Sequence, residues 1–295
     1  MSYHSGFVAL VGRPNVGKST LLNAVLGRKI AIATPKPQTT RISIRGILHS
    51  ASAQLVLVDT PGVHRATSKL GHHMVRSAKT EARGVDALWH IVDVSRPPRE
   101  EDQWAADMCR AASAPTWLIA NKADLVGRVQ ERIRPYQELA PYQAWYEVSA
   151  LKEKGLERLI GDALQALPEG DPYFPEDMVT DQPEDTYVGE TIREQILMAV
   201  QDEVPHSVAV VVEERTRRSN DKIYVRATIY VERESQKAII IGAKGKMLRK
   251  IGEQARVELE TYYERSVYLD LWVKVRRHWR EQEEWLKRLG FQDPE

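Results

Sequence analysis

Short apolar runs alternate with stretches of helical periodicity through the first half of the chain. The run Phe7–Val11 ends at Gly12, and residues 20–26 then place apolar side chains at the spacing of a helix that Gly27 ends. Four further apolar runs follow, at residues 55–58, 87–92, 116–120 and 145–148, with helical patterns between most of them. The alternation predicts an α/β domain with a mostly parallel, doubly wound sheet covered by helices on both faces.

The second half has a different order of elements. Helical spacing over residues 190–203 precedes two strand patterns, Val208–Glu213 and Ile223–Val231. An isoleucine-rich stretch and a further helix follow, and a strand over Val267–Val275 and a helix over Trp279–Leu289 close the chain. This order predicts a smaller α+β domain.

Charge marks the boundary between the halves. Residues 169–185 hold seven acidic residues, several prolines and no basic residue, a composition that cannot bury enough apolar area to form an element of its own. Residues 215–280 hold 17 Lys and Arg against 8 Asp and Glu. We therefore predict a first domain over residues 1–170, an acidic proline-rich linker over 171–185 and a basic second domain over 186–295.

The overall composition excludes several classes of protein. With 295 residues, 42% of them hydrophobic and 28% charged, the chain can bury two cores. The single cysteine, Cys109, cannot form an internal disulfide and is expected to be a buried small apolar side chain. The apolar runs fall far short of the roughly 20 residues that span a bilayer, and no signal-peptide pattern opens the chain. A secreted or integral membrane protein is therefore not expected.

The strongest motif lies between the first predicted strand and the first predicted helix. It reads Gly12-Arg13-Pro14-Asn15-Val16-Gly17-Lys18-Ser19 and matches G-x-x-x-x-G-K-[ST]. Glycines let successive backbone N–H groups turn toward phosphate oxygens, and the helix N-terminus adds its dipole. Lys18 is expected at the β- and γ-phosphates of a nucleotide and the Ser19 hydroxyl on Mg²⁺, with Thr20 beside them.

A second motif, Asp59-Thr60-Pro61-Gly62, directly follows the apolar run at 55–58. A carboxylate at the end of a strand can hold Mg²⁺ through a water molecule. Gly62 can offer its N–H to a γ-phosphate that a diphosphate lacks.

The motif Asn121-Lys122-Ala123-Asp124, which follows the run at 116–120, predicts which nucleobase the site binds. The Asp124 carboxylate can accept two parallel hydrogen bonds from the N1–H and N2–H₂ edge of guanine, a donor pair that adenine lacks. Ser149-Ala150-Leu151, after the run at 145–148, would supply a backbone N–H to guanine O6. The nucleotides expected are therefore GTP and GDP.

Together these motifs resemble the translational-GTPase-like class of P-loop GTPases, in the TrmE-Era-EngA-like group. The resemblance implies that Pro37-Gln38-Thr39-Thr40-Arg41 is the first switch region, with Thr40 on Mg²⁺ and sensing the γ-phosphate. Thr39 stays open as the alternative, because register alone does not decide. No catalytic side chain is assigned; Lys18, Thr40 and Gly62 are expected to sense or stabilise the γ-phosphate.

Val63 stands where small signalling GTPases place a glutamine that orients the attacking water. A valine side chain forms no hydrogen bond, so we expect slow intrinsic hydrolysis that depends on a partner or a monovalent cation. Asn15 resembles the asparagine of GTPases that recruit K⁺ beside the phosphates, which makes K⁺ a candidate cofactor with GTP, GDP and Mg²⁺.

The basic domain carries a G-x-x-G loop, Gly242-Ala243-Lys244-Gly245, and residues 237–250 hold five basic residues and no acid. Two glycines let two helices meet closely, and the backbone of a KH-type loop clamps about four unpaired nucleotides. The residues expected to face phosphates are Lys244, Lys246, Arg249 and Lys250. The residues expected to supply an apolar groove beside the bases are Ile239, Ile240, Ile241 and Ile251, with core packing as the alternative. Trp272 and Trp279 are expected to be buried, with stacking on bases as the alternative.

The order of all these features, with Pro175-Glu176-Asp177 in the linker and the run 202–206, resembles the bacterial Era GTPases over nearly the whole chain. The resemblance implies a P-loop GTPase domain followed by a type II KH domain that binds the 3′ end of 16S ribosomal RNA and assists maturation of the 30S subunit. No DNA partner is expected. It also implies a cytoplasmic protein with peripheral association to the inner face of the cell membrane, for which the sequence shows no anchor.

Two other functions are weighed against this one. An RNA chaperone in which GTP hydrolysis is incidental is the alternative, and the intact Lys18, Ser19 and Asp59 argue against it. A tandem-domain assembly GTPase would need a second phosphate loop, which the chain lacks. The pair His72-His73 shows no metal-ligand spacing and is expected to be solvated.

Overall fold

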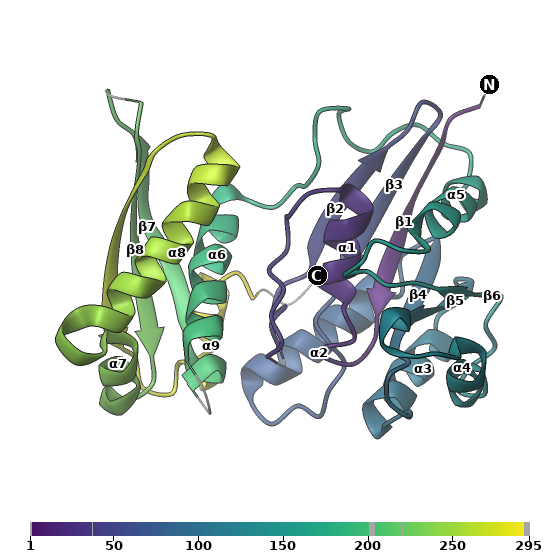
Figure 1. Cartoon of the computed structure of the whole chain (residues 1–295), viewed down its shortest axis with the longest axis horizontal. Coiled ribbons are helices and arrows are strands. Elements are labelled where there is room, and N and C mark those ends of the chain that lie inside the picture. Colours follow the sequence, from purple (N-terminus) through teal and green to yellow (C-terminus); the bar gives the residue numbers. More distant parts are fainter. Residues whose placement is uncertain (1, 37, 201–203, 220, 292–295) are drawn as a thin grey trace.

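The structure is a computed structural model that describes residues 2–36, 38–200, 204–219 and 221–291. Pro37 of the predicted switch and residues 202–203 of the predicted run 202–206 therefore lie outside the described residues. Two domains lie side by side, the first at the right of Figure 1 and the second at the left.

The first domain has the predicted alternation of strands and helices. In chain order it contains β1 (His4–Val11), α1 (Lys18–Leu26), β2 (Ile44–His49), β3 (Ala53–Asp59), α2 (Lys69–Glu81), β4 (Ala87–Asp93), α3 (Glu100–Ala111), β5 (Thr116–Asn121), η1 (Ala123–Leu125), α4 (Val129–Gln137), β6 (Ala144–Glu147) and α5 (Leu156–Ala166). The described strands form one sheet in the order β2-β3-β1-β4-β5-β6, parallel except for β2. The carboxyl ends of β1, β3 and β5 therefore meet along one edge, where ligands bind in sheets of this kind.

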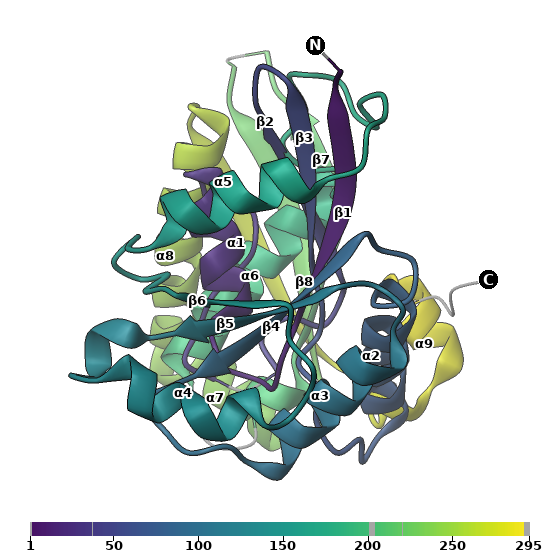
Figure 2. The ribbon, with the colours of Figure 1, turned by 90° about the vertical axis from the view of Figure 1, so that its right-hand side faces the viewer.

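Alternate side chains along each strand point to opposite faces of the sheet, and helices cover both faces. Leu10 and Ile91 pack with α1 and α5, whereas Val11 and Leu88 pack with α2 and α3. Leu118 packs with α4 on that second face. Figure 2 shows α1 and α5 on one side of the twisted sheet and α2, α3 and α4 on the other. Cys109 is buried on the α3 side, as predicted, and burial raises the pKa of its thiol to about 12.

The edge strand β2 was not predicted, because its pattern is weak. Arg45 and Gly46 interrupt the apolar positions Ile44 and Ile47. Pairing with β3 in antiparallel register, from Ile44 opposite Asp59 to His49 opposite Gln54, makes the segment a strand. A tertiary contact therefore decides what local preference leaves open.

The second domain contains α6 (Glu184–Ala199), η2 (Val204–Ser207), β7 (Ala209–Arg217), β8 (Ile223–Val231), α7 (Glu234–Ile241), η3 (Ala243–Gly245), α8 (Lys246–Tyr263), β9 (Val267–Val275), η4 (Trp279–Glu281) and α9 (Glu283–Arg288). Its sheet has the order β7-β8-β9, with β7 antiparallel and β9 parallel to β8. The strands β8 and β9 have the predicted bounds. One face of the sheet packs against α6, α7 and α8.

Three predicted boundaries differ from the structure. The helix expected from residue 190 begins at Glu184, because Pro183 fits a helix start and Glu184 and Asp185 complement the positive end of the helix dipole. The predicted helix over Trp279–Leu289 is two pieces, η4 and α9, separated at Gln282. The first strand of the domain runs to Arg217 rather than Glu213, past a bulge at Val212.

The segment before α6 has no regular element, but the first domain holds it in place. The Gln54 side chain accepts hydrogen bonds from the backbone N–H groups of Tyr173 (2.8 Å) and Phe174 (3.0 Å). The backbone N–H of Ile47 donates to Val179 O at 2.8 Å. The acidic segment therefore runs along the β2 edge instead of moving freely.

The two domains share a small apolar core. Leu70 and Met74 of α2 pack with Trp279 and Leu286 of the second domain. Trp279 is fully buried, as expected, and its ring N–H donates to Ser207 O at 2.8 Å. The expectation for Trp272 is wrong: its side chain is 56% exposed, because it faces outward from β9. No helix among the described residues combines the length and apolar content of a membrane-spanning segment.

Candidate functional site

The loop from Gly12 to Ser19 joins β1 to α1 and forms a cup at the edge of the sheet. A methyl group on Gly17 would lie 2.3 Å from Asn121 Nδ2, and the φ angle of Gly17 is +99°, so this position requires glycine. The Lys18 ammonium donates to the carbonyls of Gly12 (3.2 Å) and Arg13 (3.1 Å). Burial, with Arg13 nearby, lowers the pKa of Lys18 to about 8, although Asp59 opposes this change. Keeping the ammonium charged thus costs about 3 kcal/mol, which bound phosphates would offset.

The Arg13 side chain is directed away from this cup. It is buried, pairs with Asp102 of α3 at 3.1 Å and lies 3.8 Å from Asp93. Only its backbone can contribute to a phosphate site, so the predicted contact of Arg13 is restricted to the main chain.

Three oxygen-bearing side chains converge beside Lys18. Ser19 Oγ donates to Asp59 Oδ2 at 2.6 Å, and Thr40 Oγ1 donates to the same oxygen at 3.2 Å and lies 2.7 Å from Ser19 Oγ. The other carboxyl oxygen, Asp59 Oδ1, is buried and has no hydrogen-bond partner within the described structure. Burial raises the pKa of Asp59, against the opposing effect of Lys18 and the two hydroxyls. Hard oxygen ligands around an unsatisfied carboxylate fit Mg²⁺.

The structure separates the two threonines of the first switch. The Thr39 hydroxyl donates to Lys36 O at 2.7 Å and lies 2.7 Å from the Thr34 hydroxyl, away from Asp59. Thr40 is therefore the threonine that lies at the candidate Mg²⁺ site.

The second switch begins beside the same cup. A methyl group on Gly62 would lie 2.8 Å from Pro14 N, which shows how closely the two loops approach. The next residue, Val63, donates its N–H to Gly12 O at 3.1 Å, and its side chain is buried against Ala78 and Ala82. The Val63 side chain thus points into the core and offers nothing to an attacking water.

The predicted base-binding residues lie at the ends of β5 and β6. The Asn121 amide donates to Val16 O at 2.8 Å and accepts from the N–H of Ala150 at 3.0 Å, so it positions both loops. Ser149 Oγ donates to Asp124 Oδ1 at 2.5 Å. This bond restricts the orientation of the Asp124 carboxylate, which remains accessible to solvent.

Lys122 connects the base site to the phosphate loop. Its ammonium donates to Asn15 O and to Asp93 Oδ2, both at 2.8 Å. Burial acts to raise the pKa of Asp93, but bonds from Lys122 and Ser95 outweigh it and hold that pKa below its ordinary value. The Asp93 carboxylate therefore stays ionised at neutral pH.

The first switch also contacts the second domain on both sides of Thr40. Arg193 of α6 donates to Thr39 O and to the Glu190 carboxylate. Arg41 is buried, donates to Val208 O (2.6 Å) and Pro205 O (3.2 Å), and lies 5.8 Å from the centre of the Trp279 ring.

The chain before Thr39 contacts the same surface of the second domain. Glu194 of α6 accepts from the Lys29 ammonium (2.6 Å) and from the N–H of Ala33 (3.0 Å). Lys29 also pairs with Glu258 of α8 at 3.0 Å. We call these contacts, together with those of Thr39 and Arg41, the switch clamp. None of its members in the second domain was predicted, because sequence alone does not reveal how two domains meet.

The second switch makes its own contacts with the second domain. Besides the apolar contacts of Leu70 and Met74, His73 Nε2 lies 3.1 Å from Glu283 Oε1. The expectation that both histidines are solvated thus holds for His72, which is exposed, but not for His73.

The G-x-x-G loop joins α7 to α8 as predicted. Gly242 has a φ angle of +70°, and a methyl group on it would lie 2.6 Å from Met247 Cβ, so the two helices meet closely there. Lys244, Lys246 and the pair Arg249 and Lys250 are exposed around the loop. Their charges have open access to a polyanion.

The groove beside this loop has different walls from those predicted. Ile240 and Ile251 are fully buried in the core and Ile241 is partly buried, whereas Ile239 is 48% exposed. An open groove instead runs between α8 and β9, and its lining includes Gly245, Leu248, Arg249, Gly252, Leu269 and Leu271. The sequence did contain a pattern that could have identified these residues. Leu248 and Gly252 are four positions apart and so share one helix face, and Leu269 and Leu271 are two positions apart and so share one strand face.

The low pKa of Lys18 gives a testable prediction. Phosphates need the protonated ammonium, so binding of GDP takes up a proton above pH 8, and the affinity should fall by up to about tenfold per pH unit there. Titration with a fluorescent GDP between about pH 7 and pH 9 measures this. Lys18→Arg, which stays charged throughout, is the control, and a flat profile for the natural protein would contradict the prediction.

Comparisons with known proteins agree with this geometry. Residues 7–122 match the family model described as 50S ribosome-binding GTPase, and residues 203–280 match that of the KH domain. GTPase Era of Carboxydothermus hydrogenoformans is 46% identical over 294 residues, 99% of each chain. GTPase Era of Geobacter metallireducens is 46% identical over 292 residues, 98% of each chain.

Two solved structures resemble the whole chain. A variant of Aquifex aeolicus Era bound to GDP and AlF₄⁻ is 38% identical, with a TM-score of 0.93 over 98% of this chain and 99% of that one. Era in complex with MgGDPNP and nucleotides 1506–1542 of 16S ribosomal RNA is 37% identical, with the same TM-score and coverage. The cup at the end of β1, the KH domain and the full-length similarity together place this chain in the family of GTPase Era.

Proposed function

We propose that this protein binds the 3′ end of 16S ribosomal RNA in its KH groove and assists assembly and maturation of the 30S subunit, with GTP hydrolysis setting its affinity for RNA. The observation that carries the proposal is the switch clamp. Thr40 lies at the candidate Mg²⁺ site while its neighbours Thr39 and Arg41 are bonded to the KH domain. A change at the γ-phosphate therefore acts on the RNA-binding domain directly.

We assign the residues of the nucleotide site as follows. The loop 12–19 and Lys18 hold the phosphates, and Asp124 with the loop 149–151 selects guanine. Ser19 and Thr40 would hold Mg²⁺ directly and Asp59 through water; when bound, the ion neutralises charge that develops on the phosphates. The N–H of Gly62 senses the γ-phosphate. Since Val63 cannot orient water, the residues of the site position and stabilise the triphosphate rather than activate the nucleophile.

In the KH domain, the backbone of residues 242–245 would clamp unpaired nucleotides. The basic residues Lys244, Lys246, Arg249 and Lys250 would neutralise phosphates, and the bases would enter the groove between α8 and β9. The exposed Trp272 alternates with Leu271 along β9, so its side chain lies on the other face of the sheet and is not assigned to this groove. With 16S ribosomal RNA as partner, the protein works in the cytoplasm; its peripheral association with the inner face of the cell membrane rests on the family resemblance alone.

The two sites can be separated by mutation. Gly245→Asp places a charge where phosphates approach, and it should weaken binding of an RNA of nucleotides 1506–1542 by about ten- to a hundredfold without changing GTP affinity. Aspartate tolerates the positive φ angle of Gly245, so the fold should persist. Lys18→Ala should abolish nucleotide binding and leave the KH fold intact.

Fluorescence anisotropy at fixed salt and calorimetry measure these affinities. Gly84→Asp, at an exposed glycine with open space around it, controls for the added charge. Unchanged RNA affinity of Gly245→Asp would contradict the RNA site. Equal RNA affinity of the natural protein with GTP analogue and with GDP would favour the alternative of an RNA chaperone with incidental hydrolysis.

We propose that a K⁺ ion beside the phosphates supplies positive charge that stabilises the transition state of hydrolysis. The Asn15 amide donates to Pro35 O at 2.8 Å, so Asn15 joins the phosphate loop to the segment that leads into the first switch. Hydrolysis should be at least about tenfold faster in K⁺ than in Na⁺, and Asn15→Ala should remove the difference. Phosphate release measured in matched chloride salts tests this, and equal rates in the two salts would refute the proposal.

The clamp makes Arg193 a positioning residue for Thr40. Arg193→Met should free Thr39 O and loosen Thr40, so the Mg²⁺ concentration for half-maximal binding of a GTP analogue should rise about tenfold. The same titration with GDP should change less, because a diphosphate does not need the closed switch. Arg226→Met, which removes an exposed ion pair with Glu214, is the control. An unchanged Mg²⁺ requirement would contradict this role.

A further inference from the structure

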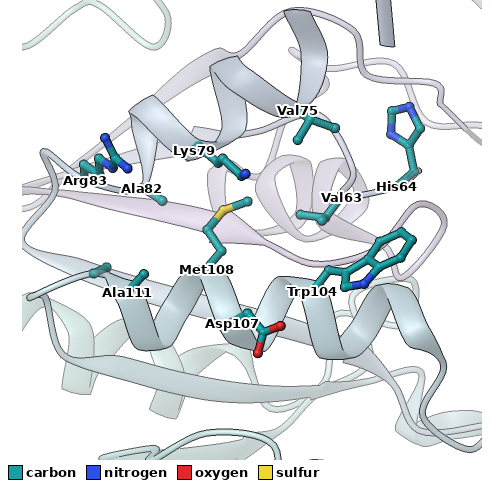
Figure 3. Close-up of a pocket in the computed structure, with 11 residues that line it drawn as sticks. Val63, His64, Val75, Lys79, Ala82, Arg83, Trp104, Asp107, Met108 and Ala111 are labelled. Atoms are coloured by element: carbon teal, nitrogen blue, oxygen red, sulfur yellow. The ribbon is translucent and has the colours of Figure 1, made fainter. Parts of the chain in front are cut away.

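A groove of about 400 Å³ lies between α2 and α3, apart from the nucleotide cup and the KH groove. Figure 3 shows Met108 rising from α3 and Lys79 reaching from α2 across the space between the helices. The apolar part of its lining includes Val63, Val75, Ala82, Trp104, Met108 and Ala111. Pockets of this size with mostly apolar walls bind ligands or anchor side chains of partners.

The rim of this α2–α3 groove carries an excess of positive charge. Lys79 lines it from α2 and Arg83 from the turn that follows this helix; both are exposed and make no ion pair within the described part of the chain. Asp107 lines it from α3, but its carboxylate is already bonded to Arg110 and to Gln103. Two free cations beside an apolar floor are complementary to an anion that carries a large apolar group.

The groove lies against the second switch. Val63 follows Gly62, the residue assigned to the γ-phosphate, and its N–H is bonded to the phosphate loop. The opposite face of α2, at Leu70 and Met74, packs on the KH domain. A group wedged between α2 and α3 therefore contacts an element that both the nucleotide and the KH domain also contact.

We propose that the α2–α3 groove is a docking site for an acidic segment of a protein partner, which inserts one large apolar side chain and places carboxylates at Lys79 and Arg83. A peptide side chain fits this floor better than a nucleobase does. The polar edges of a base would lose water here without gaining hydrogen bonds from the apolar side chains. A volume of about 400 Å³ is large enough for one aromatic side chain.

Docking should depend on the nucleotide. Val63 directly follows Gly62 and lines the groove, so a displacement of Gly62 toward a γ-phosphate would change the shape of the groove. An occupant should then bind the GTP and GDP states with different affinity. By linkage, the occupant then shifts the relative affinity for the two nucleotides by the same factor.

Short peptides test the chemistry of the groove. The probes are the capped tripeptides Glu-Trp-Glu, Lys-Trp-Lys and Glu-Ala-Glu, added to the full chain labelled with ¹³C at its methionine methyl groups. Met108 reports on the groove, and the exposed Met198 of the KH domain reports non-specific binding. Glu-Trp-Glu should shift Met108 with a Kd on the order of 1 mM, and the other two probes should bind at least about tenfold more weakly.

Two variants complete the test. The double change Lys79→Glu and Arg83→Glu should abolish the Met108 shift, whereas Thr80→Glu, one position along the same helix, should leave it unchanged. Ala111→Trp, at an exposed position of the groove, should occlude the site. Equal shifts from all three peptides, or binding that survives the double charge reversal, would overturn the proposal. Equal affinity of Glu-Trp-Glu for the GDP and GTP-analogue forms would overturn the link to the second switch.

Discussion

Thr40 can hold its hydroxyl at the candidate Mg²⁺ site because both of its neighbours are anchored in the other domain. Ordering the backbone of three switch residues costs about 1–2 kcal/mol each, and a hydrogen bond to a charged group returns about 1.5–3 kcal/mol. The bond from Thr40 to Asp59 does not cover that cost alone. The bonds of Arg193 to Thr39 O, and of Arg41 to two carbonyls of the second domain, supply the remainder.

The KH domain is therefore part of the GTP-binding machinery rather than an appendage to it. The first switch meets α6 and η2, and the second switch meets Trp279 and α9 through Leu70 and Met74. Both elements proposed to respond to a γ-phosphate thus contact the domain that carries the proposed RNA groove. A single two-state rearrangement at this interface can serve both ligands, and any coupling must then be equal in the two directions.

Sequence patterns predicted most of what local chemistry determines. The phosphate loop, Asp59, Asp124 and the G-x-x-G loop each follow from a spacing with one physical purpose, and the structure places them at strand ends and between helices as expected. The failures have a common cause: β2, the switch clamp and the walls of the KH groove depend on long-range contacts. An isoleucine such as Ile240 suits a groove wall and a core equally well, and the packing of α7 places its side chain in the core. The acidic residues Glu184 and Asp185, assigned to a linker, instead begin α6. Acidic residues are typical both of linkers and of the first turn of a helix, where they stabilise the positive end of the helix dipole.

The most direct measurement is a binding cycle on the full chain, with RNA of nucleotides 1506–1542 and with Mg²⁺ throughout. The Kd for RNA is measured with GTP analogue and with GDP, and the ratio of the Kd values for the two nucleotides is measured with and without RNA. If the first switch joins the two sites, the RNA affinity differs between nucleotide states, and RNA shifts the nucleotide preference by the same factor. An RNA affinity that is identical with either nucleotide would show that the contacts between Thr39, Arg41 and the KH domain transmit nothing.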